Sequence, residues 1–288
     1  MKSTRLLIEE DTPLIDLVMV VKSYSTVSRA RNFIKSGGVI IDGITHKLPA
    51  SILKSGQKVE VLDQIPKSKS KLDFEKSLDV LWQDKHYVAV FKPVGAASVD
   101  AGSSSSISDK MKSIAKSQGI DFAPVCINRI EKKESGILLF AMGPKEAREM
   151  KELWPRMDKK FYAIVPSPFE RDRLRLQHKL VMNRIELLKH SPSSPDAREA
   201  ELNIRKLNAN DEFTLLKIEA DPGFRQQVRA QLAQAGLPVC GDKRYGSKVN
   251  PLHQICLHLF SLSFVHPITG ENIELKTQVP RDFLRLTK

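Results

Sequence analysis

The stretch that decides the fold is NRIEKKESGILLFA, from Asn128 to Ala141, in which a charged loop leads directly into an apolar run. Five charged residues crowd the loop, and GILLFAM then continues without interruption from Gly136 to Met142. An apolar run of this length is typical of a strand that is buried on both faces. A carboxylate at the junction would lie near an apolar pocket that tunes its properties. The segment by itself favours the alternative, a solvated charged turn.

A second informative segment is DPGFRQQVRAQLAQAG, residues 221–236, which predicts an amphipathic helix that ends at Gly236. We expect Arg225, Gln226 and Arg229 at the start of this helix, where free N–H groups and the positive end of the helix dipole attract a phosphate or a carboxylate. An ordinary solvated helix face is an equally common interpretation of the same pattern.

The residues around these two segments predict further elements. VLWQDKHYVAVFKP predicts two strands around a polar turn, and a helix over about 109–117 follows the serine-rich loop AGSSSSIS. PKEAREMKELW predicts a helix with proline in its first turn. FYAIV and FTLLKIEA predict strands, and the polar stretch HSPSSPDARE between them predicts an exposed loop.

The N-terminal part of the chain has a pattern of its own. TPLIDLVMVVKSY and VSRARNFIKSG carry apolar residues at helical spacing, and the second helix is expected to end at Gly37 and Gly38. VIIDGITH predicts a hairpin that turns at Asp42 and Gly43. The segment PKSKSKLDFEKS has the composition of a linker. We therefore expect one domain at residues 1–62, a linker at 63–77 and a second domain at 78–288.

The charge of the chain is its most informative bulk property. A formal net charge of +12 and a pI near 9.5 attract polyanions, of which nucleic acid is the commonest in a cytoplasm. Surplus lysine that serves only solubility is an equally good interpretation of the charge alone. The charge argues against a protein-interaction scaffold. Cys126, Cys240 and Cys256 lie far apart and have no zinc-like spacing, which fits a reducing cytoplasm. No apolar stretch has the length of a membrane span, and no secretory signal is expected.

Five ordered blocks of the sequence resemble the RluA-like pseudouridine synthases, which isomerise uridines in ribosomal and transfer RNA. The resemblance runs from about Leu78 to Phe283 and rests on VLWQDKHYVAVFKPVG, NRIEKKESGILLFA, KKFYAIV, GFRQQVRAQLAQAGLPVCGDKRYG and LHLFSLSFVHPITGENIELKTQVPRDF. It implies an α+β fold: a small helix-and-strand RNA-binding domain followed by a mixed, mainly antiparallel-sheet pseudouridine synthase domain.

The resemblance also implies a set of site residues. Glu131 stands where the family has its essential aspartate, which acts after the uridine is flipped out of the RNA. Arg229 matches the arginine that pairs with this carboxylate, and Phe161 stands where most relatives have a tyrosine that packs on the target base. Arg129 matches the arginine that fills the space left in the RNA. Gly136 matches the glycine that lets the next strand pack tightly.

Several positions depart from the family pattern. Asn128 replaces a histidine, Glu134 replaces a threonine, and Phe224 with Arg225 replaces an Arg-Thr pair. Glutamate at position 131 extends the carboxylate by one methylene, roughly 1.5 Å, and a misplacement of about 1 Å can lower a rate about a hundredfold. We still expect Arg225 to contact RNA, because it lies beside the expected phosphate-binding helix start.

The segment SRARNFIKSGGVIIDGITHKLPASILKSGQKVEV resembles the S-four-type RNA-binding domain, which often precedes these synthases. By position its helix would offer Arg29, Arg31 and Lys35 to RNA phosphates. Simple surface residues are the alternative, and the context of the module favours phosphate contact.

Two functions follow from the resemblance. The first is isomerisation of uridine to pseudouridine in structured RNA, ribosomal RNA above all and transfer RNA as an alternative, with Glu131, Arg229 and Phe161 as the catalytic residues. The second is a catalytically silent RNA-binding relative that acts in ribosome assembly or RNA folding. Both imply a cytoplasmic monomer with no metal, organic cofactor or membrane. The sequence leaves open which of the two holds, and which RNA and how many uridines are recognised.

Overall fold

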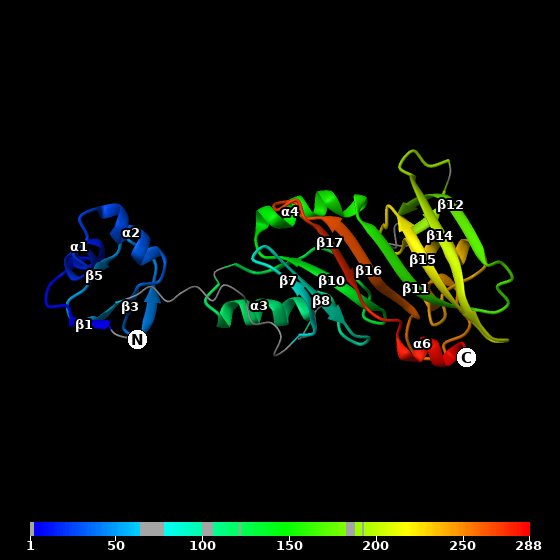
Figure 1. The fold of residues 1–288 in the computed structure, drawn as a ribbon, viewed down its shortest axis with the longest axis horizontal. Coiled ribbons are helices and arrows are strands. Elements are labelled where there is room, and N and C mark those ends of the chain that lie inside the picture. The colour runs from blue at the N-terminus through cyan, green and yellow to red at the C-terminus, as the bar shows by residue number, and fades with distance from the viewer. Residues whose placement is uncertain (1–2, 64–77, 100–105, 121, 183–187, 192) are drawn as a thin grey trace. The chain divides into compact units, whose positions relative to one another are not determined.

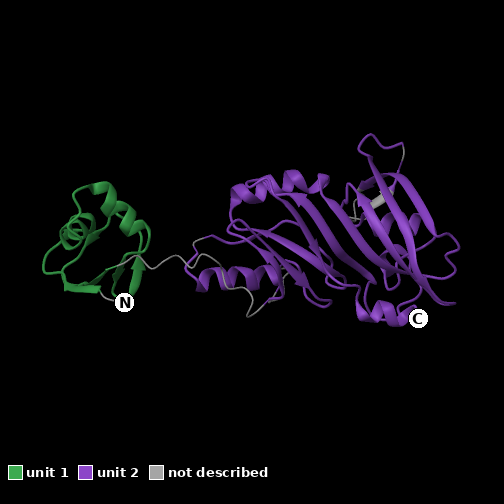
Figure 2. Ribbon diagram, viewed as in Figure 1, with its two compact units in different colours: residues 1–70 green, residues 71–288 purple. Residues whose placement is uncertain are grey.

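The computed structural model describes all of the 288 residues except 1–2, 64–77, 100–105, 121, 183–187 and 192. The chain divides into two compact units, residues 1–70 and 71–288, which Figure 2 shows in different colours. The expected linker at 63–77 lies almost entirely outside the described residues, as does most of the serine-rich loop.

Unit 1 is a small helix-and-strand body. Its elements are β1 (Ser3–Leu7), β2 (Thr12–Pro13), α1 (Leu14–Val21), α2 (Val27–Lys35), β3 (Val39–Ile41), β4 (Ile44–His46), β5 (Ile52–Leu53) and β6 (Lys58–Leu62). Four strands form one antiparallel sheet in the order β1-β6-β3-β4, and β2 pairs with β5. The core consists of buried side chains from both helices and the sheet, with Leu14, Val18 and Ile34 fully buried.

The expected elements of unit 1 are present where the sequence places them. The second helix ends at Lys35, and Gly37 takes the left-handed conformation that a glycine after a helix end favours. The hairpin turns at Asp42 and Gly43, both with positive φ. Strand β1 was not predicted from the sequence, and it completes the sheet by pairing with β6.

Unit 2 carries the remaining strands. These are β7 (Val80–Gln83), β8 (Tyr87–Lys92), β9 (Val125–Cys126), β10 (Ser135–Ala141), β11 (Asp158–Pro166), β12 (Arg173–Met182), β13 (Leu188–His190), β14 (Arg198–Ala209), β15 (Phe213–Asp221), β16 (Leu257–Val265) and β17 (Asn272–Lys276). Its helices are α3 (Ile107–Ser117), α4 (Pro144–Leu153), α5 (Gln227–Gln234) and α6 (Arg281–Leu286), with short 3-10 turns η1 (Trp154–Arg156) and η2 (Lys243–Tyr245).

The described strands of unit 2 form one sheet in the order β13-β12-β14-β15-β11-β16-β10-β8-β7, with β17 beside β16 and β9 beside β10 (Figure 1). Its pairs are antiparallel except that of β10 with β16, which is parallel. The expected fold, α+β with a mixed and mainly antiparallel sheet, is confirmed.

The parallel pair depends on a glycine. Gly136 has a φ of +135°, and a Cβ atom at this position would lie 2.5 Å from the backbone oxygen of Leu259. Only glycine permits so close an approach between the two strands. The tight packing that was expected at Gly136 is therefore present, and it brings the loop before β10 close to β16.

Two core clusters meet near the middle of the sheet. One surrounds β8 and β10 and includes α3 and α4; the other surrounds β11 and β15 and includes α5. Phe161 of β11 packs against both clusters.

One expectation for unit 2 was wrong, and two strands were missed. The helix predicted from DPGFRQQVRAQLAQAG begins only at Gln227, after Gln226 in the left-handed conformation, and residues 227–232 are all buried. It is a core helix rather than an amphipathic one. The sequence analysis also missed β12 and β14, two long strands that flank the expected loop around residues 191–197.

His258 on β16 gives the fold a testable dependence on pH. It is buried between the hydroxyl groups of Ser135 and Thr277, each 2.8 Å from a ring nitrogen, and burial lowers its pKa from 6.5 to about 4. The unfolded chain takes up a proton near pH 6.5, whereas the folded chain does so only near pH 4. The free energy of unfolding should therefore fall by about 3 kcal/mol as the pH drops across this interval.

His258→Gln should remove most of this dependence, and the same change at the exposed His253 should leave it intact. Urea unfolding followed by tryptophan fluorescence reports on unit 2 alone, because Trp82 and Trp154 both lie there. An equal slope between pH 6.5 and 4 in His258→Gln and the parent would contradict the assignment.

Candidate functional site

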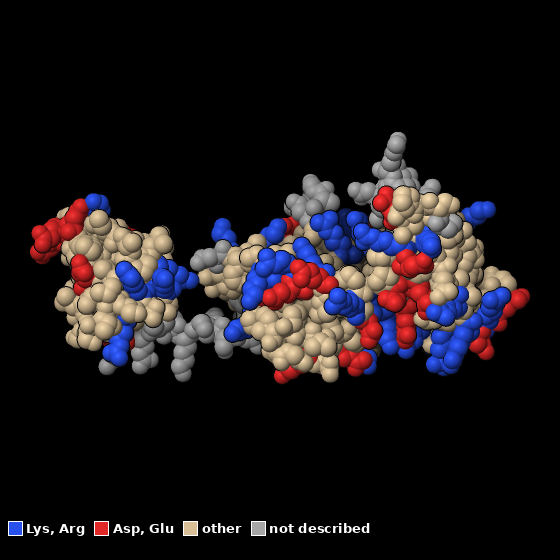
Figure 3. All heavy atoms as spheres, turned by 90° about the horizontal axis from the view of Figure 1, so that it is seen from above, with Lys and Arg blue, Asp and Glu red and all other residues tan. Residues whose placement is uncertain are grey.

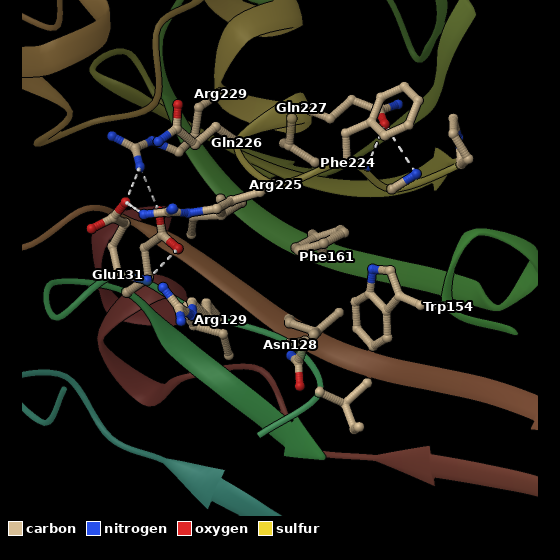
Figure 4. A pocket seen from close by; sticks show the side chains of 18 of the residues that line it. Asn128, Arg129, Glu131, Trp154, Phe161, Phe224, Arg225, Gln226, Gln227 and Arg229 are labelled. Carbon is tan, nitrogen blue, oxygen red and sulfur yellow. Dashed lines mark hydrogen bonds and ion pairs between the residues drawn. The ribbon is translucent and has the colours of Figure 1, made fainter. Parts of the chain in front are cut away.

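A cavity of about 410 Å³ lies where the two core clusters meet (Figure 4). Its wall combines the loop before β10, the end of α4, the side chain of Phe161 and the segment 222–229 that leads into α5. Leu257 and Leu259 of β16 also line it, so four of the five sequence blocks contribute to one cavity.

The loop before β10 is fixed by buried polar contacts to its backbone. Asn128 donates to the carbonyl of Ile137 and accepts from the N–H of Leu139, both at 2.9 Å. Ser98 donates to the carbonyl of Ile130 at 2.7 Å and accepts from its N–H at 3.1 Å. Asn128, which replaces the histidine of the family pattern, thus serves as a structural clamp.

Lys92 also holds this loop, through a hydrogen bond to the carbonyl of Glu134. Its fully buried ammonium group donates to the carbonyls of Pro93, Ala96 and Glu134 at 3.0, 2.9 and 2.6 Å. Burial lowers its pKa to about 8, although Glu134 and Glu131 act in the opposite direction. Three carbonyl acceptors compensate for the water that this cation loses.

Arg229 is the centre of the site's charge network. It lies on α5, and its side chain is only 2% exposed. Its Nε and Nη2 atoms donate to the buried carboxylate of Asp242, with Nη2 2.7 Å from Oδ1. Its Nη1 atom donates to Glu134 at 3.0 Å, and its guanidinium carbon lies 5.0 Å from the centre of the Tyr245 ring.

Glu131 occupies the open side of this network. Its carboxylate is 3.8 Å from Nη1 of Arg229 and accepts a hydrogen bond from Arg225 at 3.2 Å. Its side chain remains 32% exposed, whereas that of Glu134 is 9% exposed. The expected ion pair between Glu131 and Arg229 is present, but Asp242 and Glu134 are the closer partners of Arg229. Figure 4 shows both arginines directed towards Glu131.

The two buried groups of the network perturb each other. Burial raises the pKa of Glu134, and Arg229 offsets part of that shift. Burial would lower the pKa of Arg229, but the hydrogen bonds and charges of Asp242 and Glu134 raise it above its usual value. Glu134 also accepts a hydrogen bond from the backbone N–H of Glu131 at 3.2 Å, so it links Arg229 to the loop that carries Glu131.

Aromatic side chains line the other part of the cavity. Phe161 and Trp154 both border it, and Figure 4 shows the Phe161 ring between Trp154 and the charged groups. The buried ammonium group of Lys159 lies 5.3 Å from the centre of the Trp154 ring and donates to the Trp154 carbonyl at 2.7 Å. Phe224 packs beside the cavity, 5.9 Å from the guanidinium carbon of Arg198. The cavity between the charged side chains and the rings of Phe161 and Trp154 suits a planar ring.

The structure brings together the site residues that the sequence predicted in unit 2. Glu131, Arg229, Phe161, Arg129 and Arg225 all line the one cavity. Arg129 is exposed at its border and forms no ion pair with a described residue. The predicted RNA-contacting residues of unit 1 (Arg29, Arg31 and Lys35) are exposed on α2.

Sequence reasoning missed four parts of the site. Asp242 was not assigned as the partner of Arg229, and Glu134 was noted only as a departure from the family pattern. Trp154 and Lys92 were given no role. A buried acid had to be expected somewhere, because a buried arginine needs a compensating charge, but its position along the chain carries no local signal.

Two general properties complete the description. No helix within the described ranges is long and apolar enough to cross a membrane. Within those same ranges, no group of three or more His, Cys, Asp or Glu side chains is arranged to hold a metal ion.

Comparison with known proteins identifies the family. A family model described as RNA pseudouridylate synthase matches residues 86–234, slightly more than half of the 288-residue chain. The chain belongs to the RNA pseudouridylate synthase family. The matched range includes the loop that carries Glu131, Phe161 and the whole of α5, which ends at Gln234.

Curated relatives are similar over most of their length. The protein named uncharacterized RNA pseudouridine synthase YjbO of Bacillus subtilis (strain 168) is 25% identical over 218 residues, which cover 73% of this chain and 76% of that protein. Ribosomal large subunit pseudouridine synthase D of Xanthomonas campestris is 23% identical and covers 90% and 83%. tRNA pseudouridine synthase C of Vibrio parahaemolyticus is 25% identical and covers 70% and 90%.

A solved structure shares the fold. Human RNA pseudouridylate synthase domain containing 4 superposes with a TM-score of 0.59 at 20% sequence identity, covering 73% of this chain and 92% of the other. At this identity the likeness concerns the fold alone.

The buried charge network predicts a large loss of stability when Asp242 loses its charge. Asp242→Asn preserves the shape of the side chain but leaves Arg229 with only Glu134 as a close partner. We expect the free energy of unfolding of unit 2 to fall by roughly 3 kcal/mol or more. Urea unfolding followed by tryptophan fluorescence measures the change.

The matched control is Asp282→Asn. Asp282 pairs with Arg285 at 3.6 Å on the surface, where the aspartate side chain is 62% exposed. This change should cost less than about 1 kcal/mol. If Asp242→Asn lowers the free energy of unfolding no more than Asp282→Asn does, the buried charge of Asp242 does not contribute the expected stability.

Proposed function

We propose that this protein isomerises uridine to pseudouridine in structured RNA, with ribosomal RNA as the first candidate substrate and transfer RNA as the second. The observation that carries the proposal is the position of Glu131. Its carboxylate, on a side chain that is about one-third exposed, borders the cavity, 3.2 Å from Arg225 and 3.8 Å from Arg229, and Phe161 borders the same cavity. A charged carboxylate that faces a cavity lined by aromatic rings suits a flipped nucleotide.

In the proposed reaction the uridine leaves the RNA stack, and Arg129 fills the space that it vacates. The uracil stacks on Phe161. The Glu131 carboxylate, held by Arg225 and Arg229, acts as the base or nucleophile while the bond between the sugar and N1 of uracil breaks. The uracil then rotates, its C5 atom bonds to the sugar, and the proton on C5 is lost and replaced by one on N1. The product therefore has the same elemental composition as uridine.

The additional methylene of Glu131 is compatible with the way that its neighbours are arranged. Asp242 accepts hydrogen bonds from Nε and Nη2 of Arg229, and Glu134 accepts one from Nη1. Arg225 supplies the closer contact to Glu131. Relative to the family pattern, Glu134 adds one negative charge, whereas Phe224 with Arg225 keeps the single positive charge of the Arg-Thr pair and moves it by one residue, to the position from which it contacts Glu131.

The second candidate function is a catalytically silent RNA-binding relative. It is favoured by the hydrogen bond between Arg225 and Glu131, which occupies the carboxylate, and by Phe161, whose ring has no hydroxyl group for proton transfer. The two candidates differ in whether the bound uridine reacts.

Substitutions at Glu131 distinguish them. The parent should form pseudouridine, Glu131→Gln should lower the rate at least a hundredfold, a typical effect of removing an acid–base group, and Glu131→Asp should react at least as fast as the parent. The aspartate restores the shorter reach of the family pattern. Mass spectrometry of RNA from the host, after binding to that same RNA has been demonstrated, measures the product.

Glu131→Gln is the control for charge at constant length. If the parent and Glu131→Asp both bind the RNA tightly and neither yields pseudouridine, the silent function holds instead. If only Glu131→Asp reacts, glutamate at position 131 is what abolished the activity.

We further propose that residues 1–62 form an S-four-type RNA-binding domain, joined to the catalytic domain at 78–288 by residues 63–77. Arg29, Arg31 and Lys35 of α2 are exposed and form no ion pair with a described residue. By helical spacing, Arg31 and Lys35 lie on one side of the buried stripe of α2 and Arg29 on the other. Phosphate oxygens could thus be bound on both sides of the helix.

Changing Arg29, Arg31 and Lys35 to alanine should weaken non-specific RNA binding and flatten its salt dependence. Each lost phosphate contact reduces the slope of log K against log salt by about 0.7 to 0.9. Filter binding or fluorescence anisotropy over a salt series provides the measurement. A slope equal to that of the parent would exclude this helix from RNA binding.

A further inference from the structure

The face of the unit 2 sheet opposite the cavity carries a row of positive charge. Arg173 on β12 is the register partner of Arg205 on β14, and Arg205 is the register partner of Lys217 on β15. Lys217 is in turn the register partner of Tyr162 on β11. We call Arg173, Arg205 and Lys217 the basic row. Register partners in antiparallel strands point to the same face, so the three cations are direct neighbours.

The alternation along β11 places the basic row away from the cavity. Phe161 borders the cavity, and its register partner Ile218 is buried with the residues of α5. Tyr162 and Lys217, one position later and earlier, therefore point to the opposite face. On that face Leu215 is buried in the cluster that includes Phe283 of α6. The basic row lies beyond the part of this face that α6 covers.

The basic row lacks compensating acids. Arg173, Arg205 and Lys217 form no ion pair with a described residue. Two acids on the same face are paired with other cations: Glu219, which borders the same depression as the basic row, with Lys160 at 2.9 Å, and Glu201 with Arg175 at 2.6 Å. Like charges on directly opposite strand positions destabilise a sheet, and a polyanion that binds across them would relieve this repulsion.

The local shape suits a chain of phosphates. Arg173, Arg205 and Lys217 border a shallow depression of about 390 Å³, together with the ion-paired Arg175 and Glu219. The ammonium group of Lys217 lies 5.8 Å from the centre of the Phe260 ring, which restricts its position. Adjacent strands are about 4.8 Å apart, so the three cations extend roughly 10 Å across the sheet. Arginine binds phosphate through two parallel hydrogen bonds.

The row lies close to an edge of the sheet. Strand β13 pairs with β12 only at Leu180–Met182, so the Arg173 end of β12 has no partner strand on that side within the described chain. Figure 3 shows Lys and Arg side chains gathered at the end of unit 2 that β12, β14 and β15 form, with Asp and Glu beside them. An RNA held in the cavity could therefore continue around this edge.

We propose that the basic row is a second RNA-binding surface, which binds the phosphate backbone of RNA that extends beyond the segment held in the cavity. The inference rests on the proposed function for its ligand, but not on catalysis. An acidic protein is the competing occupant. RNA is favoured because the chain belongs to an RNA pseudouridylate synthase family and has a net charge of +12.

The test compares two triple variants of the full chain. One changes Arg173, Arg205 and Lys217 to alanine; the control changes the exposed Lys110, Lys112 and Lys116 of α3 to alanine. Each removes three positive charges, so their net charges are equal. The probes are a short stem-loop RNA and the same stem-loop with long single-stranded flanks, and anisotropy over a salt series gives affinity and slope.

We expect the basic-row variant to bind the flanked RNA at least tenfold more weakly than the control variant does, with a salt slope smaller by about 2, since each single-strand phosphate contact contributes about 0.7. Its affinity for the short stem-loop should equal that of the control. The variant without RNA should melt at the parent's temperature or higher, because repulsion is removed, so misfolding cannot account for the loss.

Equal affinities of the two variants for the flanked RNA would overturn the inference, including the case in which the row binds an acidic protein. Pseudouridine formation by the parent tests the proposed function separately. If the parent reacts and the basic-row variant binds flanked RNA as the control does, only the inference fails. If the parent binds neither RNA, the proposed function and the inference both fail.

Discussion

The burial of the Arg229 guanidinium group is the constraint on which the rest of the site depends. A cation with 2% exposure must be neutralised locally, because water no longer solvates it. Its partners come from separate parts of the chain: Asp242 precedes η2, and Glu134 precedes β10. The network therefore fixes α5, the turn at residue 242 and the loop before β10 relative to one another, and the cavity lies among them.

This arrangement explains why Glu131 remains available. Two buried acids satisfy most of the hydrogen-bond donors of Arg229, so Glu131 shares only one side of the guanidinium group and stays half-exposed. Its backbone is held by contacts that do not involve its carboxylate: Glu134 accepts from its N–H, and Ser98 fixes the preceding residue. Buried hydrogen bonds thus hold the backbone of the loop, while the carboxylate borders the cavity.

The sheet separates two surfaces with different chemistry. Phe161 and Tyr162 are consecutive residues of β11, yet one borders the cavity and the other continues the basic row on the opposite face. Strand alternation alone produces this division. Cations that form no ion pair with a described residue lie on both surfaces: Arg129 beside the cavity, and the basic row on the opposite face.

The sequence by itself determined the elements with strong local patterns, such as the apolar run of β10, the Asp42–Gly43 hairpin and the core segments of most helices. The family resemblance predicted that Glu131, Arg229 and Phe161 lie together, and the α+β fold. Strands β12 and β14 were missed although Arg173–Leu176 alternates with the period of a strand. Only the tertiary structure decided that Asp242 is the principal partner of Arg229 and that Arg173, Arg205 and Lys217 are neighbours. Such pairs are set by strand register and burial, which bring together residues that have no mutual signal along the chain.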